Sequence, residues 1–305
     1  MNNLFKTLTS LLILVVFSFY GQPVMAQLEN LIQPGATLEK LAGEFSFTEG
    51  PCPDSKGNIY FTDQPNNRIM IWTIDDKLET FLQPAGRANG LFIDKKGNVW
   101  ACADEKGELW EISNDKKVTV VLKGFEGKPF NGPNDLYVMK NGGVYFTDPF
   151  FVRDYWENKD MRQPEQAVYY LKPDHKTVVK INSGLQQPNG IICTPDEKLI
   201  YIADMRGRKT YSYTVNKDGS LTDKKQILEV GSDGLVLDKQ GNLYTTGSRD
   251  GVTIWDKEGK KLGSIKIPES WIANLCFGGK DNKSLFITAS KGLYRMKMQV
   301  EGIEK

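Results

Sequence analysis

A short motif recurs six times along this 305-residue chain, at steps of 40 to 55 residues. Each copy runs through a short apolar stretch into a turn and then into a second apolar stretch. The copies begin at Glu49-Gly50-Pro51, Asn89-Gly90-Leu91, Asn134-Asp135-Leu136, Asn189-Gly190-Ile191, Asp233-Gly234-Leu235 and, more weakly, Ala273-Asn274-Leu275. Self-similarity at this period, with Gly-Asn turns between β-rich runs, is typical of propeller blades. The pattern therefore predicts an all-β fold, a six-bladed β-propeller.

The residue that opens each motif is an acid or an amide in five of the six copies. Propeller blades are arranged radially, so we expect the five opening residues to converge on one central tunnel. They are Glu49, Asn89, Asn134, Asn189 and Asp233. Any one of them before a glycine could simply form a turn. Five at one repeat-equivalent position are not expected by chance, and they indicate a shared site.

Four of these side chains form a set of hard oxygen donors. Glu49 and Asp233 supply two carboxylates, whereas Asn134 and Asn189 supply amide carbonyls. Such donors suit Ca²⁺, with Mg²⁺, Mn²⁺ or Zn²⁺ as alternatives, and two negative charges balance a dication. Four protein ligands leave positions for water and substrate, as in a catalytic metal site. We therefore predict one divalent metal ion in the central tunnel, with Ca²⁺ the best match.

Charge and histidine content exclude several classes of function. The chain carries 39 Lys and Arg against 38 Asp and Glu, which argues against a nucleic-acid-binding surface. The single histidine, His175, stands in a polar turn. A histidine-based metal site or a Ser-His-Asp triad at the axis is therefore nearly excluded. Any catalysis must use carboxylates, amides, hydroxyls and a metal.

The first 26 residues have the pattern of a cleaved secretory signal. Lys6 precedes an apolar run from Leu11 to Phe19, and Val24-Met25-Ala26 is a small-residue cleavage site. An uncleaved anchor is the alternative, although the apolar run is short for a membrane span. We expect residues 27–305 to form one propeller domain, periplasmic or secreted, monomeric and not bound to a membrane. Thr37–Leu41 is well placed to be the outer strand of the last blade and to close the ring.

Two further features leave alternatives open. The four cysteines, Cys52, Cys102, Cys193 and Cys276, lie in or beside apolar strands of different repeats, which favours buried thiols. Cys52 and Cys276 belong to blades that are neighbours in a closed ring, so they are the one pair that could form a disulfide. The third repeat carries an aromatic-rich insertion from Phe150 to Gln166. It is either a substrate lid or a surface loop packed on itself.

The chain resembles the gluconolactonase, senescence-marker-protein and luciferin-regenerating-enzyme-like family over essentially all of residues 27–305. The resemblance is carried by Phe130-Asn131-Gly132-Pro133-Asn134-Asp135-Leu136, Gln187-Pro188-Asn189-Gly190-Ile191, Phe47-Thr48-Glu49-Gly50-Pro51 and Ser232-Asp233-Gly234. Members of this family are six-bladed propellers with a divalent metal, often Ca²⁺, in the tunnel. Matched residue by residue, the family's ligands fall on Glu49, Asn134, Asn189 and Asp233.

The resemblance implies an enzyme, a lactonase that opens a sugar-type lactone ring. Asp233 is the catalytic candidate, either as the general base for the attacking water or as a nucleophile. Asn89, Arg87 and Asp148 are candidates for substrate binding, although Arg87 could be a surface charge and Asp148 a turn cap. One departure concerns specificity, because Gly132 stands where the animal sugar-lactone hydrolases carry an arginine.

Three alternatives to a sugar lactonase stay open. The same metal site could serve an esterase or a phosphotriesterase. A propeller that only binds a ligand, with a metal pinning the axis, is also compatible with the motifs. Propellers similar to strictosidine synthase match the Pro-Asn-Asp and Pro-Asn-Gly blocks less well. The partner we predict is a small-molecule lactone.

Overall fold

The computed structural model describes residues 28–181, 184–247 and 250–303. The expected signal peptide, residues 1–26, lies outside the described residues. Within the described residues the regular structure consists of strands, one short 3₁₀ helix, η1 (Gln64–Asn66), and a helical turn at Leu28 and Glu29. None of the described residues forms a helix long and apolar enough to cross a membrane.

From β2 onward the strands follow one another along the chain in groups of four, and β1, from the start of the chain, completes the last group. The first three groups are β2 (Thr48–Pro53), β3 (Ile59–Asp63), β4 (Arg68–Trp72) and β5 (Leu78–Leu82); β6 (Ala88–Ile93), β7 (Val99–Ala103), β8 (Glu108–Ile112) and β9 (Val118–Leu122); β10 (Leu136–Val138), β11 (Val144–Asp148), β12 (Ala167–Leu171) and β13 (Val178–Ile181). The next three are β14 (Pro188–Cys193), β15 (Leu199–Asp204), β16 (Lys209–Val215) and β17 (Leu221–Leu228); β18 (Leu235–Leu237), β19 (Leu243–Gly247), β20 (Gly251–Trp255) and β21 (Lys261–Ile265); β22 (Ile272–Gly278), β23 (Ser284–Ala289), β24 (Gly292–Lys297) and β1 (Glu39–Ala42).

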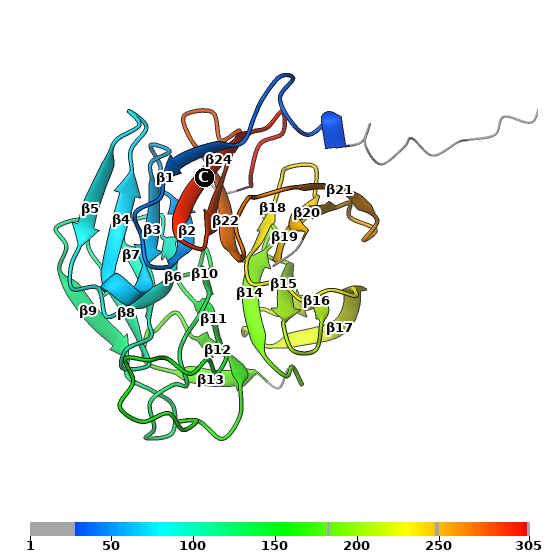
Figure 1. Cartoon of the computed structure of the whole chain (residues 1–305). Helices are drawn as coiled ribbons and strands as arrows, with labels where there is room; N and C mark the ends of the chain where they lie inside the picture. Colours follow the sequence, from blue (N-terminus) through cyan, green and yellow to red (C-terminus); the bar gives the residue numbers. More distant parts are fainter. Residues whose placement is uncertain (1–27, 182–183, 248–249, 304–305) are drawn as a thin grey trace, which may run out of the picture.

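Each group forms one antiparallel four-stranded sheet, and the six sheets surround a common centre (Figure 1). The first strand of each sheet lies innermost. Neighbouring innermost strands contact one another in the order β2, β6, β10, β14, β18 and β22, and β22 contacts β2 again. The predicted six-bladed propeller is therefore confirmed.

The ring closes through a strand from the opposite end of the chain. β1 pairs with β24 as the outermost strand of the sixth sheet, with Glu39 opposite Arg295. The Arg295 guanidinium lies 2.7 Å from a Glu39 carboxylate oxygen. The expectation that a segment near Thr37–Leu41 completes the last blade is thus confirmed, and Figure 1 shows the blue strand beside the red one.

Apolar side chains fill the space between neighbouring sheets. One such cluster joins Ile59 and Phe61 of the first sheet to Cys276 and Phe286 of the last. Cys52 belongs to a different cluster, between the first and second sheets. All four cysteines are buried, and the described residues contain no disulfide, so the pairing of Cys52 with Cys276 is not formed. Fully burying an apolar side chain such as Ile59 or Phe61 contributes about 1.5–3 kcal/mol to stability.

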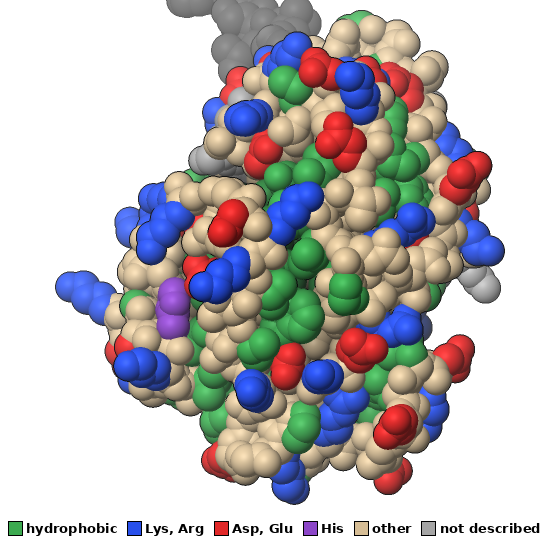
Figure 2. All heavy atoms as spheres, turned by 90° about the vertical axis from the view of Figure 1, so that its left-hand side faces the viewer, with side chains coloured by type: hydrophobic (Ala, Val, Ile, Leu, Met, Phe, Trp, Pro, Cys, Tyr) green, Lys and Arg blue, Asp and Glu red, His purple; other side chains and the backbone are tan. Residues whose placement is uncertain are grey.

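The face shown in Figure 2 mixes both signs of charge. Lysine and arginine side chains lie among aspartate and glutamate side chains, and apolar side chains gather near the middle of the view. On this face the two signs of charge are interspersed.

Candidate functional site at the propeller axis

The innermost strands begin side by side around the axis, and this brings the predicted site residues together. Glu49 and Asn89 stand second in β2 and β6, and Asn134 comes just before β10. The Gly90 amide donates to the Asn134 carbonyl at 2.7 Å, which ties the second sheet to the third. All three side chains are buried, at 2 to 3% exposure.

Small residues beside the site allow this close approach. A Cβ atom on Gly50 would lie 2.3 Å from the Asn89 carbonyl oxygen, and one on Gly90 would lie 2.4 Å from the Asn134 carbonyl oxygen. Gly50 also has a positive φ of 46°, a conformation that other residues rarely adopt. A larger side chain at either position would push the innermost strands apart.

Asp233 is held by two donors from neighbouring blades. Asn189 Nδ2 donates to Asp233 Oδ1 at 2.8 Å, and Trp271 Nε1 donates to Asp233 Oδ2 at 2.7 Å. Burial raises the pKa of Asp233 to about 6, and the bonds from Trp271 and Asn189 oppose this rise. The two bonds fix the orientation of the carboxylate.

Glu49 lies close enough to Asp233 for the two charges to interact, although 184 residues separate them in the chain. Burial raises the pKa of Glu49 well above its ordinary value, and the charge of Asp233 adds to the rise. The Gly50 amide, which donates to Glu49 Oε2 at 2.9 Å, and the Arg153 guanidinium oppose it. Two neighbouring buried carboxylates repel each other and favour a bound cation.

Two amide oxygens at the axis have no hydrogen-bond partner among the described residues. They are Asn89 Oδ1 and Asn189 Oδ1, both fully buried. An unpaired buried acceptor costs about 1–3 kcal/mol, so such atoms need a reason to persist. A cation or a substrate donor at the axis would satisfy them.

The donor chemistry fits a hard divalent cation. Within the described residues no three histidine, cysteine, aspartate or glutamate side chains gather in a metal-binding group. The set at the axis instead combines two carboxylates, Glu49 and Asp233, with amides that include the unpaired Asn189 oxygen. Carboxylate and amide oxygens together are ligands that Ca²⁺ accepts.

Asp135 and Asn274 each follow the opening residue of their motif, and their side chains meet across the tunnel. They belong to the third and sixth sheets, which face each other in a ring of six. Asn274 Nδ2 lies 3.5 Å from Asp135 Oδ2. Each side chain also accepts a bond from the next backbone amide, that of Leu275 or Leu136. Burial raises the pKa of Asp135 to about 7.

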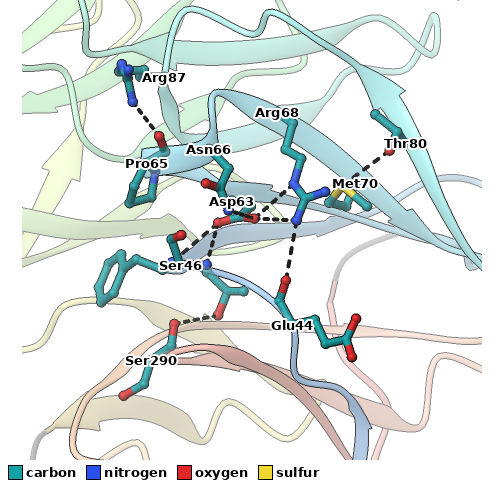
Figure 3. A network of polar contacts seen from close by, with 12 residues as sticks. Glu44, Ser46, Asp63, Pro65, Asn66, Arg68, Met70, Thr80, Arg87 and Ser290 are labelled. Atoms are coloured by element: carbon teal, nitrogen blue, oxygen red, sulfur yellow. Dashed lines mark hydrogen bonds and ion pairs between the residues drawn. The ribbon is translucent and has the colours of Figure 1, made fainter. Parts of the chain in front are cut away.

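Three second strands end in an aspartate that braces the start of its own blade. Asp63 accepts bonds from the Ser46 and Phe47 amides, as Figure 3 shows for Ser46. Asp148 accepts bonds from the Asn131 and Gly132 amides at 3.0 and 2.8 Å. Asp204 does the same for two amides of the fourth blade.

Asp148 is therefore engaged in holding the backbone that leads to Asn134. Burial raises the pKa of Asp148 to about 7, and the bonds from the Gly132 and Asn131 amides oppose the rise. The hydrogen bonds of Asp148 are to backbone amides and support the fold. Substrate binding by Asp148 stays a prediction.

Arg87 contacts the insertion and two other nearby segments. Its guanidinium donates to the Pro65 carbonyl (Figure 3) and lies 3.4 Å from a Glu105 oxygen. It also stacks over the Tyr155 ring, 4.3 Å from the ring centre. All of these contacts are with protein groups. Substrate binding by Arg87 stays a prediction.

The insertion between β11 and β12 packs against the second blade and leaves part of its surface exposed. Arg153 and Tyr155 both bond to Asp104 Oδ2, at 2.8 and 2.6 Å. Trp156 is only 4% exposed, whereas Val152 is 57% exposed. A Cβ on Gly132 would lie 2.7 Å from Asp104 Oδ1 and 3.3 Å from the Trp156 ring, so this space is already filled.

Sequence reasoning missed the residues that enter the site from outside the repeated position. Ala273 indicated that the sixth blade contributes no ligand to the site. Trp271, two residues earlier, nevertheless donates a hydrogen bond to Asp233. Arg153 and Asp104 were also missed. Arg87 and Trp271 both stand two residues before the opening residue of their motif, and that position was the available signal for Trp271.

Two surface cavities lie away from the axis and contain none of the axis residues. One of about 320 Å³ lies between the fourth and fifth blades, lined by residues that include Tyr201, Lys225 and Trp255. Another, broad and open, lies at the turn around Asp196. The buried donors and unpaired oxygens at the axis identify the site better than these hollows do.

Together the fold and the site define a six-bladed propeller with buried carboxylates and amides at its axis. The family described as SMP-30/Gluconolactonase/LRE-like region matches residues 47–291, and the chain belongs to this family. A gluconolactonase from Zymomonas mobilis is 29% identical over 90% of this chain and 85% of its own length.

Solved structures agree with this placement. The structure of a putative gluconolactonase superposes with a TM-score of 0.84 at 27% identity, covering 92% of this chain and 98% of that one. A gluconolactonase from Xanthomonas campestris superposes with a TM-score of 0.82 at 26% identity, covering 90% of this chain and 93% of that one.

Proposed function

We propose that this protein is a divalent-metal-dependent hydrolase that opens the ring of sugar-type lactones, exported after removal of residues 1–26. The observation that carries the proposal is the pair of buried carboxylates, Glu49 and Asp233, beside the unpaired Asn189 oxygen. Relatives from Zymomonas mobilis and Xanthomonas campestris are named gluconolactonases, and one from Staphylococcus saprophyticus is named a lactonase.

Glu49, Asn134, Asn189 and Asp233 would hold the cation, with Ca²⁺ the ion that best fits their donors. When bound, such an ion supplies Lewis-acid polarisation of the lactone carbonyl and offsets the negative charge that develops on its oxygen. The repulsion between Glu49 and Asp233 supports this assignment, because the positive charge of a bound dication would offset their two negative charges.

Asp233 is the residue we assign to proton transfer. Its carboxylate accepts a proton from the attacking water as the water oxygen bonds to the lactone carbonyl carbon. The acyl carbon–oxygen bond of the ring then breaks, the ring oxygen takes up the proton that Asp233 accepted, and the hydroxy acid leaves and ionises to its carboxylate, which releases a proton. Asn189 and Trp271 hold the Asp233 carboxylate in one orientation throughout.

Asn89 contributes an acceptor. Its buried Oδ1 has no partner among the described residues, so it accepts a bond from a substrate hydroxyl or from the attacking water. This agrees with its predicted role in substrate binding.

The test is hydrolysis of a panel of lactones by residues 27–305, followed by proton release, with chelator and with added Ca²⁺, Mg²⁺, Mn²⁺ or Zn²⁺. The panel holds glucono-δ-lactone, its five-membered isomer and δ-valerolactone, with a simple aryl ester and an organophosphate as comparators. Turnover of an aldonolactone that chelator abolishes and one metal restores supports the proposal. Preferred hydrolysis of the ester or organophosphate, or no hydrolysis by cooperatively melting protein, would overturn it.

A further inference from the structure

We propose that Arg153, held in place by Asp104, binds the hydroxyl groups of the lactone and the carboxylate of the opened product at the mouth of the tunnel. This inference rests on the proposed function and deepens it, because it assigns the residue that selects a hydroxylated substrate.

The first step concerns where the insertion leaves the fold. β10 and β11 are antiparallel, and the Asn134 amide donates to the Thr147 carbonyl at 2.9 Å. The end of β11 therefore lies at the same face of the propeller as Asn134, at the start of the innermost strands. Arg153 follows β11 by five residues, so it comes from a segment that begins at the mouth of the site.

The second step is a shift of one residue in the second blade. Asp63 and Asp204 lie opposite the first residues of β2 and β14, where they brace the backbone. In the second blade this place is taken by Ala103, opposite Ala88, and the aspartate comes one residue later. Asp104 is thereby released from bracing its own blade.

Asp104 instead gathers donors from two other segments. Its Oδ2 accepts bonds from Gln64 Nε2 at 3.0 Å, from Arg153 Nε at 2.8 Å and from the Tyr155 hydroxyl at 2.6 Å. The side chain is 1% exposed. Three donors on one buried oxygen fix the arginine in space, so Asp104 acts as a positioning residue.

The third step concerns the part of Arg153 that Asp104 does not use. Asp104 accepts a hydrogen bond from Nε, and in the described part of the chain the two terminal amino groups of Arg153 donate no hydrogen bond. The guanidinium lies over the Phe151 ring, 5.5 Å from the ring centre, and the side chain is 21% exposed, so part of it reaches solvent. A guanidinium carries five N–H donors in a plane, and four of them belong to these amino groups.

The pair of Asp104 and Arg153 also lies beside the segment that leads to Asn134. A Cβ atom on Gly132, two residues before Asn134, would lie 2.7 Å from Asp104 Oδ1, and Asp104 bonds to Arg153. The guanidinium is therefore held next to the start of the third blade. A ligand bound between the axis and Arg153 would meet acceptors on one side and donors on the other.

A hydroxylated lactone suits this arrangement. Its hydroxyl oxygens accept bonds from the guanidinium, and the carboxylate released on ring opening forms a charge-assisted bond with it. A lactone without ring hydroxyls offers the guanidinium only the oxygens of its ester group. Arg153 therefore distinguishes the two classes of lactone.

The test compares Arg153→Met with wild type on glucono-δ-lactone and on δ-valerolactone. We expect kcat/KM for the hydroxylated lactone to fall by about 10- to 100-fold, chiefly through KM, and that for the plain lactone to change less than about threefold. Arg153→Lys should recover part of the loss. Equal losses on both lactones would mean a structural role and would overturn the proposal.

The matched control is Arg162→Met. Arg162 belongs to the same insertion, where it stacks over Trp156 at 4.4 Å and bonds to the Phe130 carbonyl. Its substitution should leave the ratio of the two kcat/KM values unchanged. Asp104→Asn, with Arg153 retained, should lower this ratio through KM.

Calorimetric titration with gluconate separates this inference from the proposed function. Metal-loaded wild type should bind the anion about 10- to 100-fold more tightly than Arg153→Met, whatever its activity on lactones. Equal affinities, or no binding to wild type, would overturn the role of Arg153. Wild type that binds gluconate through Arg153 yet hydrolyses no lactone would overturn the proposed function alone.

Discussion

Asn274 and Asp135 lie 3.5 Å apart, Nδ2 to Oδ2, although they come from blades on opposite sides of the ring. Each also accepts a bond from the backbone amide that follows it. The contact spans the tunnel, and it depends on one partner being an amide and the other a carboxylate.

This relationship predicts the effect of exchanging the two groups. Asn274→Asp places two buried carboxylates against each other and should lower the free energy of unfolding by roughly 3 kcal/mol. Adding Asp135→Asn restores an amide–carboxylate pair with the order reversed, and should recover most of the loss. Urea unfolding of the two single variants and the double variant measures the coupling. A double variant no more stable than Asn274→Asp would contradict the contact.

Asp233→Asn tests the catalytic assignment. An amide cannot accept the proton of the attacking water, so kcat for lactone hydrolysis should fall by about 10²-fold or more. Circular dichroism should be unchanged, because asparagine is the same size as aspartate. Near-normal turnover in this variant would remove Asp233 from the mechanism.

Trp271→Phe tests the orientation of Asp233. The substitution keeps an aromatic ring and removes the Nε1 donor that lies 2.7 Å from Asp233 Oδ2. The loss of one bond to a charged group should lower kcat about tenfold with little change in KM. Steady-state kinetics measure both parameters, and a change confined to KM would argue for substrate contact instead.

Metal binding should appear in the melting temperature. Ca²⁺ in excess should raise Tm by roughly 5 °C, and a chelator should reverse the rise, because an ion that binds only the folded state stabilises it. Glu49→Gln removes one of the two carboxylates and should abolish most of this response. Differential scanning calorimetry gives the comparison. A Tm indifferent to every divalent ion in wild type would mean that the axis holds no metal.

Asp148 should give stability a recognisable pH dependence. Burial raises its pKa to about 7 in the folded protein, against an ordinary value near 4. Between these values the native state binds more protons than the unfolded state, so this residue makes the free energy of unfolding fall as pH rises from about 4 to 7.

Asp148→Asn removes that titration. Relative to Asp148→Asn, wild type should therefore lose free energy of unfolding as pH rises from 4.5 to 7. Above pH 7 the difference between the two proteins should stay constant. Chemical unfolding at matched pH values measures it. A difference that is constant with pH, or that shifts toward wild type, would contradict the raised pKa.

The sequence predicted the fold and the ring of opening residues because both follow from repetition. Equivalent positions such as Asn189 and Asp233 meet by symmetry, so their spacing in the chain carries the information. The segment that closes the ring was predictable for the same reason, since the sixth repeat lacks a fourth strand of its own.

The remaining site residues depend on departures from the repeat. Trp271 reaches Asp233 from two residues before a motif that looked empty. Asp104 holds Arg153 because one extra residue separates it from its expected place, and the path of the insertion decides where Arg153 lies. Asn274 and Asp135 meet because two opposite blades lack the usual glycine. No periodicity in the sequence predicts such contacts.

The pairing of β1 with β24 has a consequence for how the molecule is made. The two strands stand at opposite ends of the chain, with Glu39 facing Arg295. During synthesis β1 is made first and has no pairing strand until β24 has been made. Until then the first residues have no sheet edge to pair with. A chain that ends before β24 would therefore lack the strand pair that closes the ring around the tunnel.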